Sequence, residues 1–93
     1  MKIDNTPMTF IDVGDVFTVA PLHDVSLRRI FYVSKIDLFS GIVFYYSLTV
    51  NRNTSDMNIK ERFADKMAIY EHSIEYEDLI IKCVIYKVIL DEN

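Results

Sequence analysis

Two β-rich runs joined by a short loop decide the fold, and residues 28–50 read RRIFYVSKIDLFSGIVFYYSLTV. Arg28–Asp37 and Ile42–Val50 are rich in Ile, Val, Phe and Tyr, which are residues that favour strands. Between them, Leu38–Gly41 has the length of a hairpin loop and ends in glycine, which accepts a positive φ. The stretch therefore predicts an antiparallel hairpin of two long strands.

The second of these strands alternates in polarity. Its even-numbered positions, from Ile42 to Val50, are all apolar or aromatic, whereas Ser47 and Thr49 interrupt the odd-numbered ones. A period of two predicts a strand with one face, the even one, in the core. The first strand has apolar residues on both parities, and its register stays open. These competing residues are Ile30, Phe31, Tyr32, Val33 and Ile36.

Shorter β-rich runs lie at the two ends of the chain. Met8–Val13 and Val16–Ala20 are separated by a glycine and closed by Pro21, which cannot donate to a strand ladder. From Leu79 to Leu90, six β-branched residues predict a last strand that is apolar on both faces.

A helical pattern precedes this last strand. The polar stretch Asn51–Asp56 is rich in N-cap residues. Apolar residues then recur at spacings of four, four and three, which predicts an amphipathic helix ending near Glu71–Ser73. This stripe consists of Ile59, Phe63, Met67 and Tyr70. The fold prediction is one α+β domain over residues 1–93, with about five mostly antiparallel strands in a curled, barrel-like sheet (order β-β-β-β-α-β).

Composition excludes several classes of protein. The 93 residues are 51% apolar, with two Gly, two Pro and one Cys, which is too apolar for a disordered chain and too poor in cysteine for a disulfide framework. A net charge of −4 argues against a general nucleic-acid binder. The apolar content exceeds what a core of this size needs, so either the core is unusually aromatic or some apolar surface faces a protein partner or a second copy in a homodimer.

The termini and codon usage bear on location and origin. The first residues contain no apolar signal region, and the run from Leu79 to Leu90 is too short to span a bilayer and holds Lys82 and Lys87. We therefore expect a cytoplasmic protein without membrane contact, with Cys83 as a free thiol. Residues with AT-rich codons far outnumber Gly, Ala, Arg and Pro, which is typical of low-GC bacteria and their phages or mobile elements.

Catalytic motifs are missing from the sequence. It contains no G-x-G-x-x-G, P-loop, G-x-S-x-G, H-E-x-x-H or C-x-x-C pattern. His72 lies among carboxylates and could bind a metal, but a solvated acidic turn explains it more simply. Cys83 with His23 or His72 could form a nucleophile–base pair, yet an apolar strand favours a buried, inert thiol. We expect no enzyme, no cofactor and no metal.

Two groups of residues could bind a partner. Arginines beside aromatics on paired strands are typical of single-stranded nucleic-acid binding, although core aromatics explain the same pattern. This first group is Arg28, Arg29, Tyr32 and Tyr45. The second group is a run of carboxylates that could meet a basic protein surface. These carboxylates are Glu71, Glu75, Glu77 and Asp78.

The negative charge lies in the second part of the chain, so it argues less against nucleic-acid binding by the first part and makes the carboxylate run a specific candidate. Residues 1–55 are balanced in charge, and residues 56–93 carry the whole −4. Our leading hypothesis is a small non-catalytic protein-binding module, an accessory protein of a phage or mobile element that inhibits a host factor by occlusion. A nucleic-acid-binding small β-barrel and a structural homodimer are the alternatives.

Overall fold

In the computed structural model of the chain, the structure describes residues 1–23, 25–65 and 70–91. Over these residues, six antiparallel strands form one sheet in the order β1-β6-β2-β3-β4-β5. The elements are β1 (Lys2–Pro7), β2 (Val16–Val19), β3 (Leu27–Asp37), β4 (Ile42–Asn51), the α-helix α1 (Asp56–Ala64), β5 (Glu71–Glu75), the π-helical turn η1 (Asp78–Lys82) and β6 (Ile85–Ile89). The α+β prediction is confirmed, and the sheet is an open one with β1 and β5 as its edges, not a closed barrel.

The β3–β4 hairpin is the longest part of the sheet, and its extent matches the prediction. A bulge in β3 explains why the register could not be predicted. Val33 pairs with Tyr45 and Lys35 with Phe44, so Ser34 is an extra residue without a partner on β4. One extra residue reverses which positions of β3 face each side of the sheet. β3 therefore needs apolar residues at both even-numbered and odd-numbered positions.

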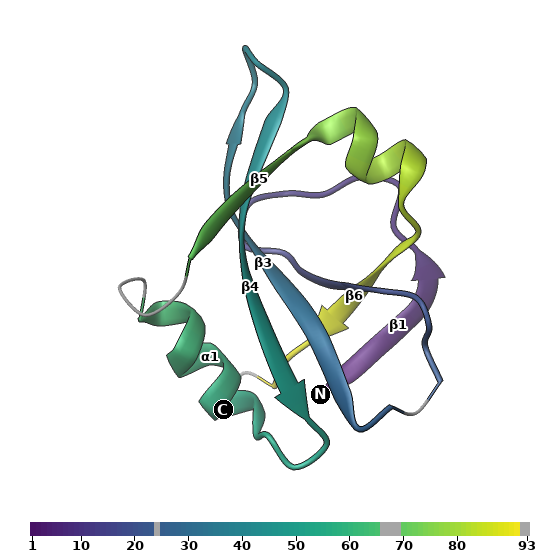
Figure 1. Cartoon of the computed structure of the whole chain (residues 1–93), viewed down its shortest axis with the longest axis vertical. Helices are drawn as coiled ribbons and strands as arrows, with labels where there is room; N and C mark the ends of the chain where they lie inside the picture. The colour runs from purple at the N-terminus through teal and green to yellow at the C-terminus, as the bar shows by residue number, and fades with distance from the viewer. Residues whose placement is uncertain (24, 66–69, 92–93) are drawn as a thin grey trace.

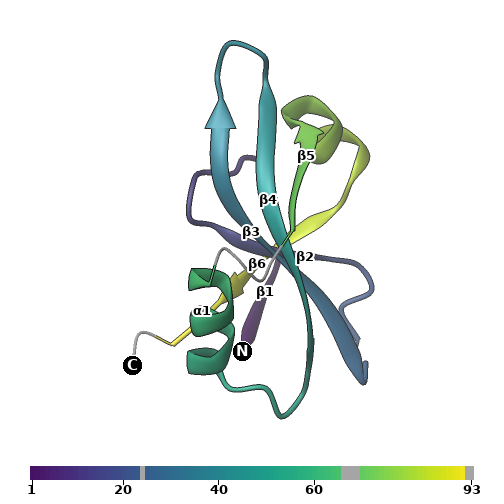
Figure 2. The ribbon, with the colours of Figure 1, turned by 60° about the vertical axis from the view of Figure 1, so that its left-hand side comes forward.

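Both faces of the sheet are buried, by different elements. On the face toward α1, here called the helix face, the core consists of Val16, Ile30, Tyr46, Leu48, Val50, Ile59, Phe63 and Val88. On the opposite face, a second core consists of Ile11, Phe17, Val33, Val43, Leu79 and Ile85. Figure 2 shows α1 and η1 on opposite sides of the hairpin. The prediction that β4 buries only its even positions is therefore wrong, because Val43 is fully buried on the opposite face.

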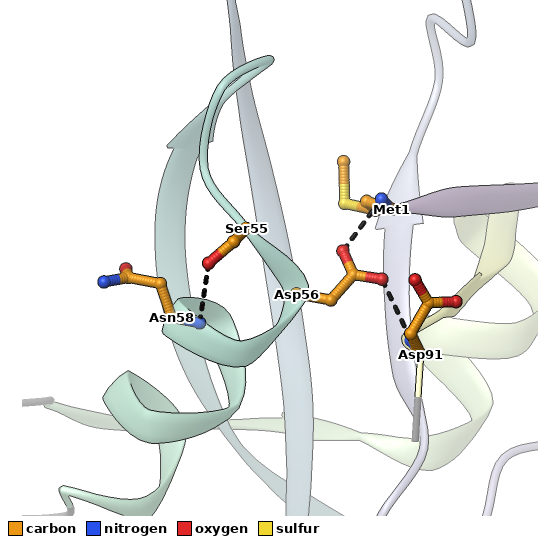
Figure 3. A network of polar contacts seen from close by, with 5 residues as sticks. All are labelled: Met1, Ser55, Asp56, Asn58 and Asp91. Carbon is orange, nitrogen blue, oxygen red and sulfur yellow. Dashed lines mark hydrogen bonds and ion pairs between the residues drawn. The ribbon is translucent and has the colours of Figure 1, made fainter. Parts of the chain in front are cut away.

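The helix is shorter than the apolar stripe predicted. Ser55 caps it by accepting the Asn58 N–H at 3.1 Å (Figure 3), and Ile59 and Phe63 are its buried residues. The helix ends at Ala64, and Glu71–Ser73, where we expected its end, belongs to strand β5. Tyr70 is exposed outside the helix, and Met67 lies outside the described residues.

Two strand predictions also need correction. Met8–Val13 forms no strand; it is an irregular segment whose Ile11 enters the second core, while the first strand is the polar β1. In the run from Leu79 to Leu90, only β6 is a strand. Its first part is helical because Leu79 must cover the second core, and an Asp78–Lys82 ion pair of 3.0 Å supports the turn.

Asp56 joins the start of α1 to the residue before β1 and to a residue after β6. Its Oδ1 lies 2.8 Å from the amino nitrogen of Met1, and its Oδ2 accepts the Asp91 N–H at 2.9 Å (Figure 3). The bond from the amino group, followed by the bond from Asp91, lowers the pKa of the Asp56 carboxyl below its usual value. The carboxylate therefore connects α1 to β1 and to the residues after β6.

Candidate functional site

The tip of the β3–β4 hairpin presents two apolar side chains to solvent. Leu38 is 88% exposed and Phe39 is fully exposed, at 104% of its reference area. In Figure 1 the tip extends beyond η1 at the upper end of the molecule. A large apolar pair held away from the core is unfavourable in water and is typical of a residue that anchors a protein–protein contact. We refer to Leu38 and Phe39 as the tip pair.

The loop that carries the tip pair is fixed by its own hydrogen bonds. The Asp37 carboxylate accepts the N–H groups of Phe39 at 3.0 Å and Ser40 at 3.4 Å, and the Gly41 N–H donates to the Asp37 carbonyl at 2.8 Å. Gly41 has a φ of 68°, which glycine adopts without strain. The loop is therefore ordered before any partner arrives, and this lowers the entropic cost of binding.

Electrostatics keep this loop in place at neutral pH. The backbone N–H of Phe39, and next that of Ser40, lower the pKa of Asp37 below its usual value. The carboxyl group is thus ionised over the whole physiological range and remains an acceptor for both amides.

Part of the acidic group lies directly beside the tip. Strand β5 pairs with β4 as far as Glu75, opposite Ile42, and the Tyr76 N–H then donates to the Gly41 carbonyl at 2.7 Å. Glu75 and Glu77, both exposed, flank this contact in the sequence. The structure therefore places two carboxylates next to the loop that carries the tip pair.

The other two predicted carboxylates have different surroundings. Glu71 lies at the far end of β5, where its Oε2 accepts the hydroxyl of Ser34 at 2.9 Å. The pKa of the Tyr46 phenol is raised, first by burial and then by the charge of Glu71. Asp78 forms an ion pair with Lys82 and thereby raises the pKa of Lys82. The four predicted residues are thus not one equivalent cluster, and Glu75 and Glu77 are the pair at the tip.

The predicted nucleic-acid residues lie on two different faces of the sheet. Tyr32 packs in the helix-face core, where it stacks on Phe63 with ring centroids 5.5 Å apart. Arg28 donates to the carbonyls of Pro21 at 2.9 Å and His23 at 3.2 Å, and so holds the segment after β2. These two side chains support the fold. Arg29 and Tyr45 lie on the opposite face. Each is the direct neighbour in its strand of a helix-face residue, and successive side chains of a strand point to opposite faces.

Five aromatic rings form a row on that opposite face. The centroid distances are 5.1 Å for Phe17–Phe31, 5.6 Å for Phe31–Tyr45, 5.5 Å for Tyr45–His72 and 5.1 Å for His72–Tyr70. The first four rings come from β2, β3, β4 and β5 in turn. His72 is therefore part of an aromatic row rather than of an isolated acidic turn.

Sequence reasoning missed the tip pair and most of this row. The signal for the tip pair was an apolar dipeptide in a hairpin loop, where turn chemistry usually selects polar residues. The row depends on the pairing of β4 with β5, and that pairing was hidden because β5 has no strand pattern of its own.

The sequence also suggested a metal site and a reactive thiol, and the structure describes the surroundings of both. In the three described ranges, no group of three or more His, Cys, Asp and Glu side chains is placed to hold a metal ion. Cys83 is a free, half-buried thiol packed against the second core. No helix in the described part of the chain has the length and apolarity to cross a membrane.

Comparisons of the chain with protein-family models, with curated proteins and with solved structures found no significant match.

Proposed function

We propose that this chain is a small, non-catalytic protein-binding module that inserts its tip pair, Leu38 and Phe39, into an apolar pocket with a basic rim on a larger protein. The observation that carries the proposal is that Leu38 is 88% exposed and Phe39 fully exposed on a loop already ordered by Asp37. Most binding energy at protein interfaces comes from a few large side chains that become fully desolvated.

The carboxylates beside the tip pair indicate the chemistry of the partner surface. Glu75 and Glu77 flank the residue that contacts the tip loop, and both are exposed. The pKa of Lys82 is raised first by its ion-pair partner Asp78 and further by the charge of Glu75. Carboxylates at the rim of an interface speed encounter with a basic surface and disfavour acidic ones. We therefore infer a partner with lysine or arginine around an apolar pocket.

The mechanism that follows is occlusion. A projecting loop that fills a pocket excludes any other ligand of that pocket, and no chemical step is needed. An inhibitor of a host factor, encoded by a phage or mobile element, is the role we propose for such a module.

Differential capture from a cell lysate tests the proposal. The bait variants are Leu38→Ser with Phe39→Ser, and Glu75→Lys with Glu77→Lys. Their matched controls are Met57→Ser and Glu61→Lys, both on exposed positions of α1. We expect a protein that is captured by the wild-type chain and by both controls. Its capture should be lost with the Leu38→Ser, Phe39→Ser bait and weakened with the Glu75→Lys, Glu77→Lys bait. Capture that is the same for all five baits, or no capture that depends on the tip, contradicts the proposal.

A further inference from the structure

The opposite face of the sheet carries a second feature, which the proposed function does not use. Its row of rings crosses β2, β3, β4 and β5, and the rings are not equally accessible. Phe17 is buried, at 2% exposure, and Phe31 and Tyr45 are half-buried. His72 is exposed and Tyr70 is 79% exposed. The row therefore begins in the core and ends in solvent. Tyr45 stacks on His72 at an interplanar angle of 25°, so the accessible rings are those of His72 and Tyr70.

This face differs in charge from the rest of the molecule. The register pairs Arg29 with Thr49 and Phe31 with Ser47, and on β5 His72 lies opposite Tyr45. Along β3, β4 and β5 the side chains of this face include no carboxylate, although the chain as a whole carries a charge of −4. The acidic residues of β5, Glu71 and Glu75, alternate with His72 and so belong to the other face.

A ligand for this face needs planar groups and negative charge. Exposed rings on a sheet stack on bases, and an arginine beside them contacts the phosphate backbone. An acidic peptide would satisfy Arg29 but would leave the rings without planar partners. A duplex keeps its bases stacked inside and would not reach the rings either.

We propose that this face binds single-stranded nucleic acid, with the exposed rings of His72 and Tyr70 stacking on about two bases and Arg29 contacting the backbone. The surface is separate from the tip pair, because His72 and Tyr45 lie on the β4–β5 ladder away from the loop at Gly41. The inference does not depend on the proposed protein contact.

Binding of labelled oligonucleotides tests this inference. The probes are a fluorescent 12-nucleotide single strand of mixed sequence as DNA, the same sequence as RNA, and the DNA duplex, each measured by anisotropy at low salt. We expect both single strands to bind and the duplex to bind at least about tenfold more weakly. A difference between the DNA and RNA arms identifies which of the two the face prefers.

Variants locate the binding on the molecule. Arg29→Gln and His72→Ala, both at exposed positions, should each weaken single-strand binding by about tenfold. Lys35→Gln removes the same charge from β3 on the helix face and should leave the affinity unchanged within about twofold. The Leu38→Ser, Phe39→Ser variant should also bind normally, which separates this result from the test of the proposed function.

Several outcomes would overturn the inference. Equal losses for Lys35→Gln and Arg29→Gln would show unspecific charge attraction. Binding of a poly-glutamate peptide that depends on Arg29, without binding of either single strand, would assign the face to an acidic protein segment. Absence of any single-strand binding at low salt would reject it outright.

Discussion

Asp37 is the side chain on which the order of the tip loop depends. Replacing it with alanine removes the acceptor for the N–H groups of Phe39 and Ser40. We expect faster hydrogen exchange at these two amides and weaker partner binding, with little change in the stability of the whole domain. Exchange rates at both amides that equal those of the wild type would contradict this role.

The same carboxylate predicts how the loop responds to pH. The folded pKa of Asp37 lies below the ordinary value of 3.8, because Phe39 and Ser40 donate to the ionised form. Its contribution to stability is therefore fully present above the unfolded pKa and is lost as the pH falls through the folded pKa. In an NMR titration, the Phe39 amide shift should have its midpoint below 3.8. A midpoint at or above that value would be inconsistent with these hydrogen bonds.

Asp56 has a structural role that is independent of binding. Asp56→Asn removes the negative charge that faces the Met1 amino group and accepts the Asp91 N–H. We expect a loss of about 1–2 kcal/mol in the free energy of unfolding, measured with urea at neutral pH. Glu61→Gln, on an exposed position of the same helix, should change stability by less than about 0.5 kcal/mol. Equal effects of the two substitutions would show that the Asp56 contacts contribute nothing specific.

At the scale of elements, the bulge in β3 gives the clearest prediction. Ser34 is the extra residue between Val33 and Lys35, so its deletion leaves a regular ladder in which every other side chain keeps its face. Deletion of Ser47 from β4, in contrast, turns one half of that strand over and exposes either Leu48 or Tyr46. Thermal unfolding followed by circular dichroism should show a folded protein for the first deletion and an unfolded one for the second. Two unfolded proteins, or two folded ones, would contradict the register.

The elements also show where sequence reasoning succeeds. The β3–β4 hairpin and the helix start were predictable, because strand propensity, alternation, a loop glycine and an N-cap serine all act over a few neighbouring residues. Strands β1 and β5 were not, because each is a short, mostly exposed edge strand whose pairing with one neighbour leaves no apolar alternation. The turn η1 was mistaken for strand, because the need to cover the second core with Leu79 overrides the β propensity of its neighbours.

The candidate site was only partly predictable for a similar reason. A local run of carboxylates is visible in the sequence, but the contact between Tyr76 and Gly41, which selects Glu75 and Glu77, is made between distant parts of the chain. Arg28 and Arg29 look equivalent in sequence, yet alternation places them on opposite faces with different roles.

At the scale of the whole molecule, two separate surfaces differ in their chemistry. The projecting end carries an apolar pair with carboxylates beside it, and the opposite face along β3, β4 and β5 carries rings and an arginine without carboxylates. A net charge of −4 therefore describes the sum of two unlike surfaces. Raising the salt concentration should slow association at the first surface with a basic protein and weaken nucleic-acid binding at the second.

The central claim is that the tip pair anchors a protein partner, and an affinity measurement tests it most directly. Titration calorimetry with the purified captured protein would compare the wild-type chain with Phe39→Ala and with the control Met57→Ala. For an interface anchored by this ring we predict a loss of at least about 2 kcal/mol, or roughly 30-fold in Kd, for Phe39→Ala only. Affinities within about twofold for all three chains would contradict the claim.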